Sequence, residues 1–453
     1  MKHTYKILVF VMLVLVFLMP SCKKYLDKKP DKALQVPNSL SDLQALLDDG
    51  YLLNGTNGVS FDEASADDYY VPDDLYNDLS VNNRNAYLWR NTDYTNYPND
   101  WGYIYNVVNI ANIVLDNVQE IAITALNKNE WNNIKGSALF HRSFAFLQGA
   151  SIFCKAYDDN TSAQDYGLVL RLTSDITLPS VRASVKDTYN RIIEDLKSAV
   201  PLLPDLPVHV LRPSKNSAYA LLARTYLSMR KYDSCAKYAN LSLLIKSELI
   251  NYNAVDVTAF VPFERFNAEV QFYNIINQPN YASIDPYYAR VDSLLYSSYA
   301  SDDLRKEAFF YQSFPGYTFK GSYSPYQLFT GIATDEVYLM RAESYARLGD
   351  KDAALSDLNT LLVKRWRTGT FVPVAASTAN EALGIILIER RKQLLFRNLR
   401  WMDIKRLNKE GANIVLKRII SGETYLLQPN DNKYALSLPA DIINMTGMQQ
   451  NPY

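Results

Sequence analysis

One spacing of large and small side chains occurs twice in the chain, at positions far apart in the sequence. The first copy consists of Tyr219, Ala223, Tyr226, Met229, Tyr232 and Cys235, and the second of Tyr338, Ala342, Tyr345, Leu348, Gly349, Ala354 and Leu358. Residues three or four positions apart share one face of a helix, so each copy predicts an apolar helix face. The small alanines lie where a second helix can cross closely. Each copy therefore predicts a pair of packed helices.

This arrangement is typical of tetratricopeptide repeats, whose helix pairs recur with a period of about 34 residues. Residues 192–204 fit the second helix of another pair, whose first helix would lie within 136–157. Because the pairs do not adjoin, they predict a scaffold that carries insertions and not a continuous array. The predicted fold class is all-α, a tetratricopeptide-like helix-pair scaffold with long, irregular and aromatic-rich insertions.

Helical spacing also occurs outside these pairs. Further helices are predicted at the end of 23–50 and within 100–112, 130–157, 185–200, 335–366 and 380–409, and residues 434–439 are predicted to be extended. In the 100–112 helix, Trp101 lies on the same face as Val108 and Asn112, so it is assigned to the core.

Two long stretches lack a sustained helical period but are rich in aromatic residues. These residues are Tyr51, Phe61, Tyr69, Tyr70, Tyr76, Tyr87, Trp89, Tyr94 and Tyr97 in the first stretch, and Phe260, Phe263, Phe266, Phe272, Tyr273, Tyr281, Tyr287, Tyr288, Tyr311, Phe314, Tyr317, Tyr323 and Tyr326 in the second. Disordered segments are poor in aromatic residues, so residues 50–99 and 250–333 are predicted to be ordered loops. Loops of this length are usually functional. Tyrosine, with 34 copies, combines an apolar ring and a polar tip, which suits it to stacking on sugars or holding peptides.

The N-terminus has the pattern of a secretory signal. Lys2 and Lys6 precede an apolar run at 7–19, which is too short for a membrane span of about 20 residues. The next residues lead into Cys22 and resemble a bacterial lipobox, whose cysteine is acylated and becomes the new N-terminus. Several acyl chains on one residue would hold the chain stably on a membrane. The alternative is an ordinary signal peptide that leaves Cys22 as a free thiol.

Residues 1–21 are therefore predicted to be removed, and 22–453 to form a single domain. Within this domain we expect an N-terminal half at 22–250 with the first repeat units, a ligand-loop insertion at 251–333 and a C-terminal helical part at 334–453. The chain has 47 basic and 48 acidic residues, and loss of the leader leaves a net charge near −3. A nucleic-acid partner would need a basic face, so such a partner is not predicted.

The sequence lacks recognisable signatures of catalysis. His141 and His209 are the histidines left after the leader, and neither lies in a zinc-protease or triad-like motif. His141 is expected to be a hydrogen-bonded helix residue. Cys154 and Cys235 are expected to be buried free thiols, with a disulfide bond as the alternative. No catalytic residue, metal site or cofactor is predicted.

Two charged segments need a structural explanation. Asp62, Glu63, Asp67, Asp68, Asp73 and Asp74 lack the spacing of a calcium loop, so they are predicted to be solvated loop carboxylates. The basic segment 389–406 carries apolar residues at helical spacing, and Asp403 can pair with Arg400 or Arg406. It is predicted to be a structural helix-turn-helix.

Several of these features occur together, in one order, in a known family. They are Cys22, the early Tyr25, Leu26, Asp27 and Pro30, the helix with Trp101, Tyr105, Val108 and Asn112, the dispersed repeats, the block from Glu389, Arg390 and Arg391 to Arg406, and the tail from Leu438 and Pro439 to Asn451 and Pro452. In this combination the mature chain resembles the SusD/RagB family of Bacteroidetes outer-membrane lipoproteins. Surface-exported members often carry acidic residues after the lipidated cysteine, whereas Lys23 and Lys24 follow Cys22 here.

The resemblance implies a helical tetratricopeptide scaffold that packs against a SusC-like, TonB-dependent outer-membrane receptor. It also implies a lipid-anchored cell-surface protein that captures oligosaccharides, or peptides in one branch, and delivers them to the transporter without catalysis. Two other functions stay open at this stage. One is an anchored glycoside hydrolase, because the separation of a carboxylate pair is a three-dimensional quantity. The other is a purely structural assembly subunit.

The ligand site is predicted in the two aromatic insertions, because loops on a rigid scaffold often become binding surfaces. Trp89 and Tyr94 are predicted as stacking platforms. The remaining candidates are the hydrogen-bonding residues Asp68, Arg84 and Asn85 and, from the second insertion, Tyr287, Tyr288 and Tyr323.

Overall fold

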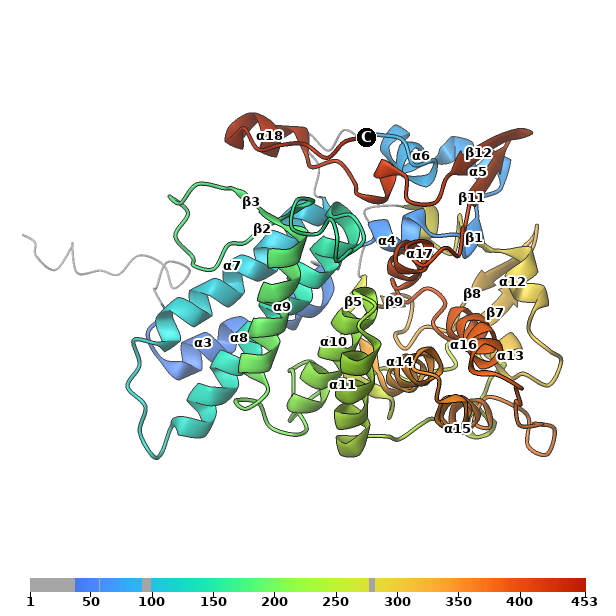
Figure 1. Cartoon of the computed structure of the whole chain (residues 1–453), viewed down its shortest axis with the longest axis horizontal. Coiled ribbons are helices and arrows are strands. Elements are labelled where there is room, and N and C mark those ends of the chain that lie inside the picture. Colours follow the sequence, from blue (N-terminus) through green and yellow to red (C-terminus); the bar gives the residue numbers. More distant parts are fainter. Residues whose placement is uncertain (1–36, 57, 92–98, 277–281) are drawn as a thin grey trace, which may run out of the picture. The chain divides into compact units, whose positions relative to one another are not determined.

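A row of long helices forms the scaffold of the protein (Figure 1). The computed structural model describes residues 37–56, 58–91, 99–276 and 282–453, and Leu40–Tyr453 form one compact unit. The helices of this unit are α3 (Leu40–Leu47), α4 (Phe61–Ser65), α5 (Asp73–Asp78), α6 (Val81–Tyr87), α7 (Asp100–Val118), α8 (Lys128–Phe153), α9 (Val185–Ala199), α10 (Lys215–Ser228), α11 (Tyr232–Ile245), α12 (Ser293–Ser297), α13 (Arg305–Phe309), α14 (Thr334–Arg347), α15 (Lys351–Leu362), α16 (Ala379–Gln393), α17 (Arg400–Asn408) and α18 (Ala440–Thr446). The prediction of an all-α scaffold is confirmed.

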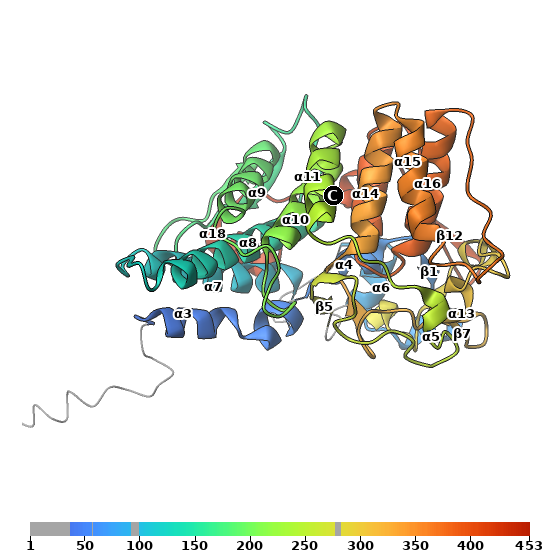
Figure 2. The same ribbon diagram turned by 90° about the horizontal axis from the view of Figure 1, so that it is seen from below.

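The predicted helix pairs are present. Helix α10 packs against α11, α14 against α15 and α8 against α9, and α11 also packs against α14. Figure 2 shows α10, α11, α14, α15 and α16 standing side by side. Ala223 and Ala342 are fully buried, as expected for residues at close helix crossings. Gly349 lies in the turn between α14 and α15 with φ of +88°, a backbone conformation that favours glycine.

The strands are short and lie mostly in the insertions. They are β1 (Tyr69–Tyr70), β2 (Tyr166–Val169), β3 (Arg182–Ser184), β4 (Val270–Phe272), β5 (Ile275–Ile276), β6 (Arg290–Val291), β7 (Phe310–Gln312), β8 (Tyr317–Phe319), β9 (Leu328–Phe329), β10 (Ile332–Ala333), β11 (Leu416–Ile420) and β12 (Glu423–Leu427). All pairs are antiparallel: β1 with β6, β2 with β3, β4 with β10, β5 with β9, β7 with β8 and β11 with β12. Because β1 belongs to the first insertion and β6 to the second, this pair joins the two insertions.

Two features near the C-terminus add to the sequence prediction. Of residues 434–439, predicted to be extended, Tyr434 ends the short 3₁₀ helix Asn432–Tyr434, and the rest form no helix or paired strand, with Ala435 in an extended conformation. The hairpin β11–β12 was not predicted. Its connection, Ser421 and Gly422, has positive φ at both residues, as two-residue hairpin turns of the primed type require.

The prediction of solvated carboxylates is wrong for the segment at 62–68, where Asp62, Glu63 and Asp68 are buried and Asp67 is partly buried, whereas Asp73 and Asp74 are exposed as predicted. Arg400 binds Asp67 through two nitrogen–oxygen contacts of 2.7 and 3.0 Å, and Arg391 binds Asp68 at 2.8 Å. Burial alone would raise the pKa of Asp67, but the guanidinium groups of Arg400 and Arg391 hold it well below its usual range. These arginines replace the water that the prediction assumed around the carboxylates.

The segment 389–406 is a helix-turn-helix, as predicted, formed by α16 and α17. Asp403 lies between two arginines, at 2.8 Å from Nε of Arg390 and 2.8 Å from Nε of Arg406, so the predicted pair with Arg406 is present. Arg406 also binds Glu343 of α14 through contacts of 2.5 and 2.7 Å. A chain of buried ion pairs therefore fastens α16 and α17 to the repeat helices.

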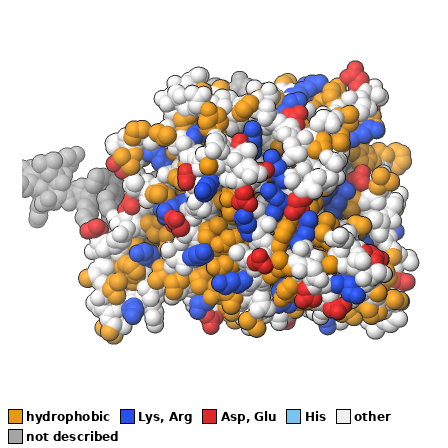
Figure 3. Space-filling model, viewed as in Figure 1, with side chains coloured by type: hydrophobic (Ala, Val, Ile, Leu, Met, Phe, Trp, Pro, Cys, Tyr) orange, Lys and Arg blue, Asp and Glu red, His pale blue; other side chains and the backbone are white. Residues whose placement is uncertain are grey.

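Charged side chains are not gathered into patches of one sign on the face shown in Figure 3. Basic and acidic side chains are interspersed there.

In the part of the chain that the structure describes, no helix is both long and apolar enough to cross a membrane. Cys154 and Cys235 are buried and free, which confirms the prediction for both thiols.

Replacement of Asp403 by asparagine tests the buried ion pairs. At neutral pH, Asp403→Asn should lower the free energy of unfolding by about 3–5 kcal/mol, because it leaves two buried arginines undercompensated. Burial opposes ionisation, but Arg390 and Arg406 lower the pKa of Asp403 to about 2. The carboxylate therefore stabilises the fold fully above its ordinary pKa near 4, and this contribution is lost as the pH falls toward 2.

Urea unfolding at a series of pH values measures this effect. The difference in stability between wild type and Asp403→Asn should be largest above pH 5 and shrink toward pH 2. Asp352, whose side chain is 91% exposed, is the matched control, and Asp352→Asn should change stability by less than about 0.5 kcal/mol. A difference for Asp403→Asn that does not vary with pH would contradict the role of the carboxylate.

Candidate functional site

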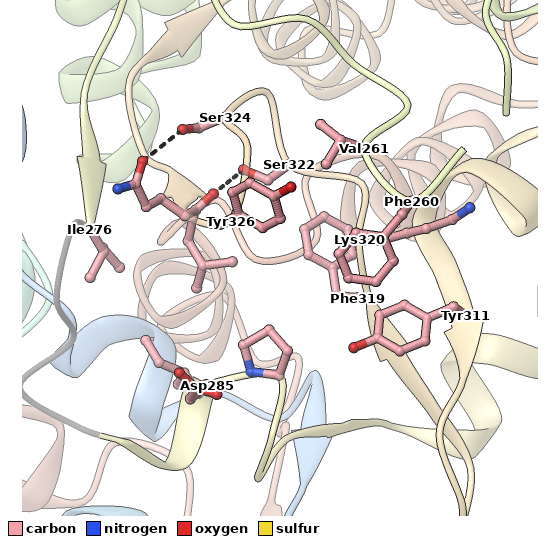
Figure 4. A pocket seen from close by; sticks show the side chains of 14 residues that line it. Phe260, Val261, Ile276, Asp285, Tyr311, Phe319, Lys320, Ser322, Ser324 and Tyr326 are labelled. Atoms are coloured by element: carbon pink, nitrogen blue, oxygen red, sulfur yellow. Dashed lines mark hydrogen bonds between the residues drawn. The ribbon is translucent and has the colours of Figure 1, made fainter. Parts of the chain in front are cut away.

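A cavity of about 320 Å³ lies within the second insertion (Figure 4). Its lining consists of Phe260, Val261, Ile276, Ile284, Asp285, Pro286, Tyr311, Phe319, Lys320, Ser322, Ser324, Tyr326, Gln327 and Leu328. All of these residues belong to the insertion predicted at 251–333. The volume is within the range of about 300–1,000 Å³ that is usual for small-molecule sites.

The strand pairs of the insertion explain why these residues meet. Ile276 lies opposite Leu328 in the pair β5–β9, which supplies one wall. Tyr311 and Phe319 lie on the hairpin β7–β8 and supply another. A short 3₁₀ helix, Ala282–Ile284, leads into the third wall at Asp285 and Pro286.

Aromatic rings at the rim are open to solvent. Phe260 is 58% exposed and Tyr326 is 84% exposed. The ring centroid of Phe260 lies 5.3 Å from that of Tyr311 and 6.3 Å from that of Tyr326. Tyr326 has a φ of +62°, which is uncommon for a residue with a side chain and is found at turns and binding sites. The three rings form an aromatic cluster at the mouth of the cavity.

Polar groups hold the turn at 322–328 in place. The Ser322 hydroxyl donates to the carbonyl of Gln327 at 2.6 Å and accepts the amide N–H of Phe329 at 3.0 Å. The Ser324 hydroxyl donates to Oε1 of Gln327 at 3.2 Å and accepts from the Tyr273 hydroxyl at 2.6 Å. Figure 4 shows the two serine bonds to Gln327. The turn that carries Tyr326 is therefore fixed from both sides.

Trp89 and Tyr323, which were predicted to contact the ligand, are covered by protein, so these two predictions are wrong. Trp89 is 3% exposed, and its indole N–H donates to the carbonyl of Ser65 at 3.0 Å. Tyr323 is fully buried, and its hydroxyl donates to Glu269 at 2.5 Å while the Arg397 guanidinium lies 4.0 Å from its ring centroid. Burial raises the pKa of Tyr323 well above its ordinary value. Neither ring has a face that a ligand can reach.

The predicted site residues of the first insertion do not line the cavity where the structure describes them. Asp68 is buried in its ion pair with Arg391, so it does not face a ligand either. Arg84 and Asn85 are partly exposed on α6 and do not line the cavity. Tyr94 and the lipidation candidate Cys22 lie outside the described residues.

Tyr287 and Tyr288 are the predicted residues that lie beside the cavity. They directly follow the lining residue Pro286, and their rings meet edge to face with centroids 4.9 Å apart. Tyr287 is 63% exposed. Of the two insertions predicted to bind ligand, only the second lines this cavity, and its lining residues Phe260, Tyr311 and Tyr326 were not among the predicted site residues. No signal in a single sequence separates these rings from their buried neighbours, because strand pairing decides which rings are covered.

The two histidines of the described structure lie in different environments. His141 is buried against Phe140 and Phe272, and burial lowers its pKa to about 4, so its imidazole is neutral. The predicted hydrogen bond of His141 is not found at Nε2. His209 accepts an amide N–H of Leu211 through Nδ1 at 3.2 Å. Among the described residues, no three His, Cys, Asp or Glu side chains are grouped as metal ligands.

Comparison with known proteins agrees with this architecture. Residues 24–227 match a family described as starch-binding and associating with the outer membrane, and residues 334–452 match the SusD family. Together these two segments span more than half of the chain. No curated protein matches the chain.

Solved structures share the fold at low sequence identity. A putative sugar-binding protein from Bacteroides vulgatus has a TM-score of 0.75 and 21% identity, over 92% of this chain and 99% of that protein. A SusD superfamily protein from Bacteroides thetaiotaomicron has a TM-score of 0.74 and 20% identity, over 92% of this chain and 100% of that protein. A SusD-like carbohydrate-binding protein from Bacteroides vulgatus has a TM-score of 0.70 and 21% identity, over 90% of this chain and 96% of that protein.

The helix-pair scaffold, the two joined insertions and both family matches lead to one conclusion: the chain belongs to the SusD/RagB family of outer-membrane-associated, carbohydrate-binding proteins.

Proposed function

We propose that this protein is a cell-surface lipoprotein that binds a nutrient oligosaccharide in the cavity of its second insertion and passes it to a TonB-dependent outer-membrane transporter. The observation that supports binding is the aromatic cluster of Phe260, Tyr311 and Tyr326 at the mouth of a 320 Å³ cavity. Such rings offer rigid apolar faces against which the C–H faces of sugar rings can pack. Tyr287 extends this aromatic surface along the rim.

The lining of the cavity favours binding over hydrolysis. Glycoside hydrolysis generally needs two carboxyl groups that flank the scissile bond. Among the described residues that line the cavity, Asp285 supplies the one carboxylate. The other polar lining residues are serine, glutamine, tyrosine and lysine, and none of them supplies a second carboxylate.

The membrane part of the proposal comes from the leader and from the family. Cys22 follows an apolar leader and a lipobox-like tripeptide, and the matching family is described as associating with the outer membrane. An acylated Cys22 would keep the binding domain close to a transporter, so captured ligand would be released at a high local concentration.

Removal of the exposed rings should weaken ligand binding. In calorimetric titrations of residues 23–453 with a panel of oligosaccharides and peptides, Phe260→Ala and Tyr326→Ala should each cost about 1–2 kcal/mol, or roughly five- to thirtyfold in affinity. Tyr51, an exposed tyrosine that does not line the cavity, is the control, and Tyr51→Ala should bind as wild type does. If both alanine variants bound an oligosaccharide as tightly as the wild type, the cavity would not be the binding site. Binding of peptides but of no oligosaccharide would favour the peptide-binding branch.

Replacement of Cys22 should detach the protein from the membrane. We expect the wild-type chain in the outer-membrane fraction and Cys22→Ala in the periplasmic fraction, because a single cysteine carries all the acyl chains. Mass spectrometry of the wild-type N-terminal peptide should find acylated Cys22. Cys154→Ala is the control, because Cys154 is buried in the fold and should not affect fractionation. Membrane retention of Cys22→Ala would contradict the proposed anchor.

The transporter partner can be identified directly. Affinity purification of the full chain from detergent-solubilised native outer membranes should recover a TonB-dependent receptor in a fixed ratio, as judged by mass spectrometry. The Phe260→Ala variant should recover the same receptor, because its substitution affects ligand and not assembly. Purification of the chain without any TonB-dependent receptor would argue against the proposed transfer.

A further inference from the structure

Lys320 lies in the cavity wall, but its ammonium group is directed to the backbone. Nζ donates to the carbonyls of Val257, Thr258 and Ala259 at 3.1, 3.3 and 2.8 Å. A lysine ammonium has three N–H donors, so these three acceptors use its full donor capacity. Burial also lowers the pKa of Lys320, which fits a cation held against the protein and not in water.

These bonds hold the segment that brings Phe260 and Val261 to the cavity. Lys320 directly follows β8, whose last residue Phe319 also lines the cavity. The lysine therefore ties the irregular chain at 257–259 to an ordered hairpin, immediately before the aromatic residue at the rim. Without this tie, Phe260 would lose the support that fixes its distance from Tyr311 and Tyr326.

Asp285 is the other charged residue of the lining. Its Oδ1 accepts the amide N–H of Tyr287 at 2.8 Å, which fixes the direction of the carboxylate. A carboxylate has about four lone-pair sites, so acceptor capacity remains for ligand hydroxyl groups. Arg290 on β6 does not line the cavity. Its Nη1 donates to the carbonyls of Pro286, Tyr287 and Ala289, whereas its buried Nε has no hydrogen-bond partner.

Within the lining, Asp285 therefore offers a carboxylate acceptor, while the ammonium group of Lys320 donates to backbone carbonyls and not to a ligand. We propose that the cavity selects an uncharged, hydroxyl-rich oligosaccharide over an acidic one. In this proposal Lys320 is a positioning residue that holds Phe260, and Asp285 is the group that disfavours anionic ligands. The inference rests on the proposed function, because it names the charge class of the ligand at that same cavity.

The test compares each neutral oligosaccharide that binds with the same oligosaccharide oxidised at C6 to carry carboxylates. At low salt the neutral form should bind at least about tenfold more tightly, because like charges in the bound state are unfavourable. Asp285→Asn keeps an acceptor for the Tyr287 N–H but removes the charge. This variant should reduce the preference to within about threefold, mainly because the oxidised form binds more tightly once the charge is removed. Added salt should also reduce the preference in the wild type.

Lys320 is tested with three variants. Lys320→Met keeps the length of the side chain but removes the three donors, and should weaken binding of both forms by the same factor, about tenfold. Lys320→Arg retains N–H donors and should restore part of the affinity. Lys417→Met, at an exposed position on β11, is the matched control and should have no effect. Circular dichroism and thermal melts verify that each variant is folded.

The possible outcomes separate the inference from the proposed function. Equal or tighter binding of the oxidised form would overturn the charge selection. If Lys320→Met lost binding of the oxidised form alone, Lys320 would be a ligand contact and not a positioning residue. Either result leaves oligosaccharide capture intact. Absence of binding to every oligosaccharide would overturn the proposed function and this inference together. If Lys320→Met does not fold, two measurements still test the inference. They are the ratio of the affinities of Asp285→Asn for the neutral and oxidised forms, and the affinity of Lys320→Arg.

Discussion

Buried pairs between guanidinium and carboxylate groups around α16 and α17 hold the structure together. Arg400 and Arg391 bind the first insertion at Asp67 and Asp68. Glu389 binds Arg305 of the second insertion, Arg397 binds Asp335 of α14, and the Lys405 ammonium donates to the carbonyls of Ser151 and Cys154 at the end of α8. In each ion pair, one charge lies on the helix-turn-helix and the other on the segment that it binds. A buried charge without its partner is strongly unfavourable. The irregular segments are therefore stable only when they are docked on this helix-turn-helix, which sets their position without a regular sheet.

This docking divides the aromatic residues of the insertions into two groups. Tyr323 lies among the charged groups of Glu269, Arg397 and Asp335. Trp89 is buried, and the guanidinium group of Arg418 on β11 lies 5.4 Å from its ring centroid. These rings fill the core of segments that have little regular structure. Phe260 and Tyr326 lie outside the strands of the second insertion and are exposed to solvent. The same composition thus supplies both the packing of long loops and the surface proposed to hold a ligand.

The scaffold and the cavity have separate structural requirements. The repeat helices need small residues such as Ala223 and Ala342 at their crossings, and these determine how closely the helices pack. The cavity needs the strand pairs of the second insertion and the tie between Lys320 and the chain at 257–259. Because different residues meet these requirements, the lining of the cavity can vary among SusD/RagB proteins while the scaffold is maintained. This separation fits the low identity, near 20%, at which the solved relatives retain the fold.

The amino-acid sequence determined the helix pairs and the place of the two aromatic insertions between them. These features follow from local rules, namely helical periodicity, small residues at crossings and the loss of period in aromatic-rich loops. Only the tertiary structure decided that Asp68, Trp89 and Tyr323 are enclosed whereas Phe260 and Tyr326 are open, and that Lys320 faces the backbone. Exposure of a ring and the partner of a charge depend on segments far away in the chain, such as Arg391 for Asp68. Local spacing carries no information about such partners, because they meet only when the chain has folded.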